Sequence, residues 1–198
     1  MLDQVENFTF VRHAQCKANV STPGAATDGE QLTDRGEKQA QALPGLLARA
    51  GCNQPTVVLA STATRVRHTL APWLTQNPAA QVHYDPRLVE RDFKNADQQR
   101  LNQLTAQVED EASWRAFWFD KQLGAEPAQD FRDRVMDCLQ QHLPAKGGLV
   151  VAHGGVLATL LLERVGAIDD LDLLQAVPIT FTRVGQTGWR ATAAELQD

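Results

Sequence analysis

Three short stretches of the chain are almost entirely apolar. They cover residues 8–11, 56–60 and 149–152, and they are rich in β-branched and aromatic side chains. Runs of this length and composition are typical of strands that are buried on both faces of a sheet. Residues 177–184 and 189–193 are two further strand candidates, and the Gly-rich turn between them predicts a closing hairpin.

Apolar residues at helical spacing follow each of the three buried strands. Thr33 is placed to cap the first helix, which we expect to run to about Ala50 with a kink at Pro44. Ser61 or Thr62 is expected to cap the second helix. The expected helices cover residues 33–50, a segment that follows Ser61 and Thr62, and residues 130–143 and 156–165.

Strands that alternate with helices predict an α/β fold with a single doubly wound, mostly parallel sheet and helices on both faces. The stretch at about 94–130 interrupts this pattern, because four aromatic residues crowd together between polar segments without a clean period. We expect a small helical insertion there. The whole chain, residues 1–198, is predicted to form a single domain that contains this insertion.

Arginine and histidine residues follow the three buried strands. Arg12 and His13 follow the first strand, Arg65 lies shortly after the second, and His153 follows the third. Sites in doubly wound sheets lie beyond the carboxyl ends of the strands, so these side chains are expected to surround one pocket. Two arginines and two histidines around one pocket suit a phosphoryl group.

Charge, hydropathy and cysteine spacing argue against several other classes of function. The formal net charge is −5, which gives no support to nucleic-acid binding. No apolar stretch is long enough for a membrane span or a secretory signal. The three cysteines form no CxxC pair, which favours a reducing cytoplasm, and His13 with Cys16 lacks a third ligand at useful spacing, so we expect no metal site and no cofactor.

Five ordered motifs give the chain a resemblance to a known family. They are Arg12-His13-Ala14 with Asn19, Leu32-Thr33-Asp34-Arg35-Gly36-Glu37-Lys38-Gln39-Ala40, Ser61 with Arg65 and Thr69, Leu88-Val89-Glu90-Arg91-Asp92-Phe93, and Val150-Val151-Ala152-His153-Gly154-Gly155. Together they resemble the motifs of the histidine phosphatase superfamily, which includes the phosphoglycerate mutases. The resemblance spans residues 8–155.

The resemblance implies a metal-independent phosphomonoester hydrolase that acts on a small phosphorylated metabolite. His13 would be the nucleophile and would carry the phosphoryl group, and Glu90 would be the general acid and base. The remaining catalytic residues would bind the phosphate, and they are Arg12, Arg65 and His153, with further phosphate contacts from Asn19 and Gly154. His153 would be charged beside a phosphate dianion.

Two departures from the family pattern keep alternatives open. Ala14 stands where the family usually has glycine, and the residues after Phe93 lack the usual tryptophan and glycine. The second departure leaves Asp92 and Asp97 as rivals of Glu90 for the role of acid. A phosphoglycerate mutase and a phospho-ligand binding protein without turnover therefore remain as alternative functions.

Overall fold

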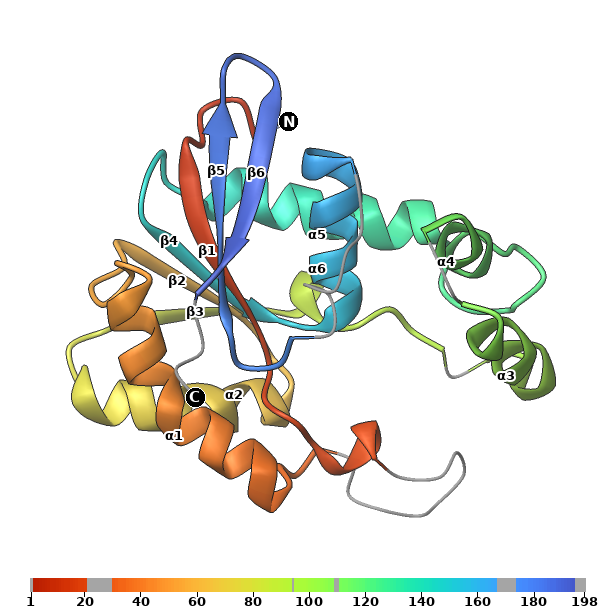
Figure 1. The fold of residues 1–198 in the computed structure, drawn as a ribbon, viewed down its shortest axis with the longest axis horizontal. Helices are drawn as coiled ribbons and strands as arrows, with labels where there is room; N and C mark the ends of the chain where they lie inside the picture. The colour runs from red at the N-terminus through yellow and green to blue at the C-terminus, as the bar shows by residue number, and fades with distance from the viewer. Residues whose placement is uncertain (1, 21–29, 94, 109–110, 167–173, 195–198) are drawn as a thin grey trace.

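The computed structural model describes residues 2–20, 30–93, 95–108, 111–166 and 174–194. Its central feature is a six-stranded sheet with the strand order β3-β2-β4-β1-β5-β6 (Figure 1). The strands are β1 Asn7–Arg12, β2 Val57–Ser61, β3 Val82–Asp85, β4 Gly148–Ala152, β5 Pro178–Val184 and β6 Gly188–Ala193.

The sheet is parallel on one side and antiparallel on the other. β1 pairs in parallel with β4, β4 with β2, and β2 with β3. β5 runs antiparallel to β1, and β6 closes the sheet as the expected hairpin. The prediction of a mostly parallel, doubly wound sheet is therefore confirmed.

Helices cover both faces of the sheet (Figure 1). α1 and α2 lie on one face, and α5 and α6 lie on the other. α3 and α4 form the expected helical insertion and stand apart from the sheet. The helices are α1 Asp34–Arg49, α2 Thr64–Gln76, α3 Gln98–Ala106, α4 Glu111–Trp118, α5 Ala128–His142 and α6 Gly154–Leu160. Short turns lie at η1 Lys17–Asn19 and η2 Pro86–Leu88, and the π-helical segment η3 Leu161–Val165 extends α6.

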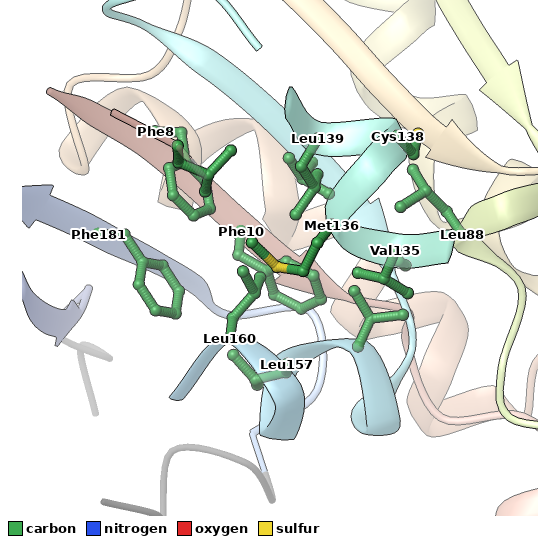
Figure 2. Close-up of a cluster of buried hydrophobic side chains, with 14 of the residues drawn as sticks. Phe8, Phe10, Leu88, Val135, Met136, Cys138, Leu139, Leu157, Leu160 and Phe181 are labelled. Atoms are coloured by element: carbon green, nitrogen blue, oxygen red, sulfur yellow. The ribbon is translucent and has the colours of Figure 1, made fainter. Parts of the chain in front are cut away.

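Each face of the sheet has its own apolar core because side chains of a strand point alternately to opposite faces. Phe8 and Phe10 of β1 point into the core under α5 and α6, part of which is drawn in Figure 2. Val11 of the same strand points into the core under α1 and α2. Since β1 is covered on both sides, its carboxyl end holds the following residues in fixed positions.

The start of α1 agrees with the prediction, whereas the start of α2 differs from it. Thr33 caps α1 as expected, and its hydroxyl accepts a hydrogen bond from the Gly36 amide at 3.0 Å. α2 instead begins after Ala63, which offers no side-chain cap, so the prediction of a Ser61 or Thr62 cap was wrong. The Ser61 hydroxyl lies 2.8 Å from a ring nitrogen of His153, which shows that a tertiary contact takes its place.

Candidate active site

The carboxyl ends of β1, β2 and β4 bring three predicted site residues into contact. The Nε of Arg65 donates to Nε2 of His13 at 3.2 Å, and its Nη2 donates to Nδ1 of His153 at 3.0 Å. The centroids of the two imidazole rings are 5.2 Å apart. One guanidinium therefore bridges two histidines that are separated by 140 positions in the sequence.

The hydrogen bonds of His13 select one tautomer of its ring. Nδ1 lies 2.8 Å from the carbonyl oxygen of Ala14, and a carbonyl can only accept, so Nδ1 carries the proton and donates. Nε2 accepts from Arg65, and its lone pair faces the guanidinium. His13 thus directs an unprotonated nitrogen toward the guanidinium of Arg65, which is permanently charged and suited to binding phosphate.

His13 is also held in its neutral form. Its side chain is almost completely buried, and burial lowers the pKa from 6.5 to about 3. The charges of Arg65 and Arg12 lower the pKa in the same direction, whereas the hydrogen bond to Ala14 raises it. A neutral imidazole with a fixed tautomer has the form that a nucleophile requires.

His153 is fixed from two sides. Since Arg65 can only donate, Nδ1 of His153 accepts, and Nε2 is left to donate to the Ser61 hydroxyl at 2.8 Å. Complete burial, followed by the permanent charges of Arg65 and Arg12, holds the pKa of His153 well below 6.5. His153 is therefore neutral when only protein groups surround it. The charged form, the imidazolium, requires a bound anion that favours it.

Glu30 is a neighbour of the site that the sequence did not indicate. Its carboxylate forms an ion pair with Nη1 of Arg65 and also accepts from the Arg65 backbone amide at 3.2 Å. The side chain of Glu30 is 39% exposed, compared with 16% for Arg65. A carboxylate therefore already lies on the guanidinium that we expect to bind phosphate.

Glu90 lies against the loop that carries His153. Its Oε2 accepts from the Gly155 amide at 3.1 Å, and its Oε1 accepts from the Arg91 amide at 2.9 Å. A β-carbon on Gly155 would lie 2.2 Å from Oε1 of Glu90 and 2.7 Å from the ring of Trp118, so a larger residue here would have to displace the Glu90 carboxylate or the Trp118 ring. Of the two rivals of Glu90, Asp97 is exposed and caps α3, whereas Asp92 is exposed and lines the same cavity as Glu90.

Arg12 and Ala14 fit tightly into the same region. A β-carbon on Gly154 would lie 3.1 Å from Cζ of Arg12, so the glycine lets the arginine pass close to the start of α6. Ala14 is fully buried against Ala40 and Ala176, and its amide donates to the Thr69 hydroxyl at 2.9 Å. Alanine at this position is thus accommodated by small neighbours.

Asn19 is mainly a structural residue of its loop. Its side-chain oxygen accepts from the Cys16 amide and from the Gln175 amide nitrogen, each at 3.0 Å. A phosphate contact from Asn19 would have to come from the nitrogen of its amide group.

Within the part of the chain that the structure describes, one group of side chains has spacing compatible with a metal ion: His83, Asp85 and His142. It lies on the edge strand β3 and at the end of α5. Both Asp85 oxygens are within 3.1 Å of the Arg87 guanidinium, which occupies the carboxylate.

The family is decided by a model match that covers nearly the whole chain. The model of the histidine phosphatase superfamily, branch 1, matches residues 8–197. This chain belongs to branch 1 of the histidine phosphatase superfamily. The resemblance found in the five motifs is therefore confirmed, and so is the expectation of a phosphomonoester hydrolase.

Known phosphatases are similar to this branch 1 histidine phosphatase over most of their length. The adenosylcobalamin/alpha-ribazole phosphatase of Salmonella typhimurium is 30% identical over 187 residues, which cover 92% of this chain and 87% of the relative. The crystal structure of the alpha-ribazole phosphatase from Shigella flexneri is 25% identical, with a TM-score of 0.62 and 95% of both chains covered. The mycobacterial glucosyl-3-phosphoglycerate phosphatase complexed with VO3 shares the fold, with 22% identity, a TM-score of 0.65, and 96% and 98% of the two chains covered.

No described helix of this histidine phosphatase is both long and apolar enough to cross a membrane.

Proposed function

We propose that the chain hydrolyses a small phosphate monoester through a phosphohistidine on His13. The observation that carries this proposal is the hydrogen bonding of His13: Nδ1 donates to the Ala14 carbonyl, which leaves Nε2 unprotonated, and Nε2 accepts from Arg65. In the first step Nε2 attacks phosphorus in line, and the bond between phosphorus and the ester oxygen breaks. Glu90 gives a proton to the departing oxygen.

The second step regenerates the enzyme. Glu90, now a carboxylate, takes a proton from water, and the water oxygen attacks phosphorus as the bond from phosphorus to Nε2 breaks. Inorganic phosphate leaves, and His13 returns to its neutral form. Glu90 thus ends the cycle protonated, as it began.

Charged and hydrogen-bonding groups around His13 stabilise the transferred phosphoryl group. Arg12 and Arg65 supply planar, permanently charged forks, which bind phosphate oxygens in two places. A dianion placed beside His153 raises the pKa of that imidazole and turns it into a third positive group. These groups provide the charge that a divalent ion provides in many other phosphatases, so we expect turnover in excess chelator.

As the substrate we propose a nucleoside-like phosphate of the alpha-ribazole 5′-phosphate type. The similarity to alpha-ribazole phosphatases, at 30% identity over 92% of the chain, supports this choice. The aromatic residues of α4 also support it, because the Trp118 ring lies beside Gly155, whose amide binds the Glu90 carboxylate. Trp114 stacks on Trp118 with ring centroids 4.9 Å apart and is only partly buried, so it offers a surface to a ringed leaving group.

The natural setting that we propose is a reducing cytoplasm. The three cysteines, Cys16, Cys52 and Cys138, are all free and buried, which fits a compartment where disulfides do not form. The partner that we propose is the small phosphorylated substrate itself.

A leaving-group comparison tests the assignment of Glu90. In Glu90→Gln, the first-turnover burst with a phosphate ester of an alkyl alcohol should slow by about 10² to 10⁴, because a basic leaving oxygen needs a proton. Nitrophenyl phosphate should be affected far less, since nitrophenolate leaves unaided. Asp92→Asn and Asp97→Asn serve as matched controls. Equal losses for both esters in Glu90→Gln, or a larger ester dependence in either aspartate variant, would remove Glu90 from this role.

The same assay separates the alternative functions. A hydrolase releases inorganic phosphate from alpha-ribazole 5′-phosphate, whereas a mutase given a phosphoglycerate returns the phosphoryl group to the product. Phosphate binding without turnover of any ester would favour a binding protein.

A further inference from the structure

The segment Val89–Phe93 carries Glu90 but belongs to no helix or strand. Backbone groups in such a segment lack the partners that regular structure provides, so side chains must supply them if the segment is to hold one conformation. The hydrogen bond of Glu90 to the Gly155 amide fixes only the end of the side chain. Other groups must therefore hold the backbone at Glu90.

Arg134 of α5 binds three carbonyl oxygens, one just before this segment and two within it. Its Nη1 donates to the carbonyls of Arg87 at 2.6 Å and Val89 at 2.9 Å, and its Nη2 donates to the carbonyl of Glu90 at 3.2 Å. These contacts cross 44 to 47 positions of the sequence. A single guanidinium thus fixes the chain from just before Glu90 up to Glu90 itself.

Glu126 holds both Arg134 and the far side of the segment. Its two oxygens accept from Nε and Nη2 of Arg134 at 2.8 and 2.9 Å, which orients the fork. Glu126 Oε2 also accepts from the Asp92 amide at 3.1 Å, and the Glu126 amide donates to the Asp92 carbonyl at 2.7 Å. The Glu126 carbonyl accepts from Nε of Arg91 at 2.7 Å. The pair therefore grips the segment on both sides of Glu90.

The guanidinium has little freedom to move. Its Cζ lies 4.6 Å from the centroid of the Phe131 ring, which is fully buried. The side chains of Arg134 and Glu126 are only 21% and 18% exposed. Lysine could replace the charge of Arg134, but its ammonium lacks the planar fork that reaches three carbonyls and two carboxylate oxygens together.

We propose that Arg134 and Glu126 are positioning residues that set the catalytic geometry of Glu90. This inference rests on the proposed function, in which Glu90 is the general acid. Neither residue touches the reacting atoms. Their effect reaches the chemistry because a proton donor that is displaced by about 1 Å can cost about 10² in rate.

The test compares Arg134→Gln, Arg134→Lys and Glu126→Gln with Arg132→Gln and Glu90→Gln. Arg132 is the matched control: it lies on the same helix, but its guanidinium pairs with Asp133 and Glu163 on the exposed side. The readout is the first-turnover burst at saturating concentrations of an alkyl phosphate and of nitrophenyl phosphate, with circular dichroism to establish folding.

The inference predicts a loss that depends on the leaving group. Arg134→Gln should slow the burst with the alkyl phosphate by about 10-fold to 10²-fold, and with nitrophenyl phosphate by less than about 3-fold. Arg134→Lys should recover only a small part of the loss. Glu126→Gln should show the same ester dependence to a smaller extent, and Arg132→Gln should show none. The losses should fall on kcat, with KM nearly unchanged.

The outcomes separate this inference from the proposed function. If Glu90→Gln depends on the leaving group and folded Arg134→Gln does not, the positioning role is wrong while Glu90 remains the acid. If Glu90→Gln slows both esters equally, both assignments are overturned. If Arg134→Gln does not fold, Glu126→Gln decides, because an ester-independent effect in that variant refutes the positioning role.

Discussion

Removing the negative charge of Glu30 should strengthen phosphate binding. The Glu30 carboxylate pairs with the guanidinium of Arg65, which also donates to His13 and His153. A phosphate dianion that binds to Arg65 must either displace this carboxylate or lie beside it. In Glu30→Gln the competing charge is gone, while the size of the side chain is kept.

The size of the effect follows from the exposure of the pair. Arg65 and Glu30 are 16% and 39% exposed, so their ion pair lies between a surface pair and a buried one. A partly exposed pair of this kind contributes on the order of 1 kcal/mol. Since 1.4 kcal/mol corresponds to a factor of ten, the dissociation constant for phosphate should fall about 5-fold.

The assay is inhibition by inorganic phosphate and by vanadate at two ionic strengths. Added salt screens exposed charges, so the difference between Glu30→Gln and the unaltered protein should be smaller in high salt. Glu37→Gln is the matched control, because Glu37 is exposed in the first turn of α1 and forms no ion pair with Arg65 among the described residues. Weaker phosphate binding in Glu30→Gln would refute the reasoning and show that Glu30 orients Arg65 for the ligand.

Three further predictions concern the phosphate site, its acid and the pH dependence of stability. Arg65→Lys should lower kcat by about 10² or more and weaken vanadate inhibition, since the ammonium lacks the fork; unchanged kinetics in the folded variant would place the phosphate elsewhere. Gly155→Ala should reduce alkyl phosphate turnover at least about 10-fold, because a β-carbon would lie 2.2 Å from Oε1 of Glu90. Gly45→Ala is the control and should keep full turnover, because a β-carbon there meets nothing closer than 3.7 Å. Equal turnover in the two variants would contradict the packing of Glu90 against Gly155. Burial lowers the pKa of His13 to about 3, so below pH 6.5 the unfolded chain takes up a proton that the folded chain does not. The free energy of unfolding, measured by denaturant titration at each pH, should therefore fall as the pH is lowered from about 6.5 to about 3, and less steeply in His13→Gln. An equal dependence on pH in the two proteins would argue against a neutral His13.

The sequence predicted the parts of the fold that depend on local pattern. The strands β1, β2 and β4 are continuous apolar runs, and the cap of α1 at Thr33 is a local hydrogen bond. β3 was missed because Val82–Asp85 contains one clearly apolar residue and lies at the edge of the sheet, where burial is partial.

The candidate site was predictable only in its main members. His13, Arg65 and His153 follow strands, and parallel strands bring their carboxyl ends together. Glu30 could not be found in this way, because its contact with Arg65 depends on the path of a loop. The same holds for Arg134, whose partners lie 44 to 47 positions away and are backbone carbonyls, which no side-chain motif marks.

The measurement that tests the central claim most directly is the trapping of a phosphoenzyme. Glu90→Gln, mixed with nitrophenyl phosphate and quenched within the first turnover, should carry one phosphoryl group on Nε2 of His13. The linkage should be a phosphoramidate, labile in acid and stable in alkali, and peptide mapping by mass spectrometry should place it at His13 and remove it in His13→Gln. A phosphoryl group on serine or aspartate, or turnover in His13→Gln at the rate of the unaltered protein, would contradict a phosphohistidine mechanism.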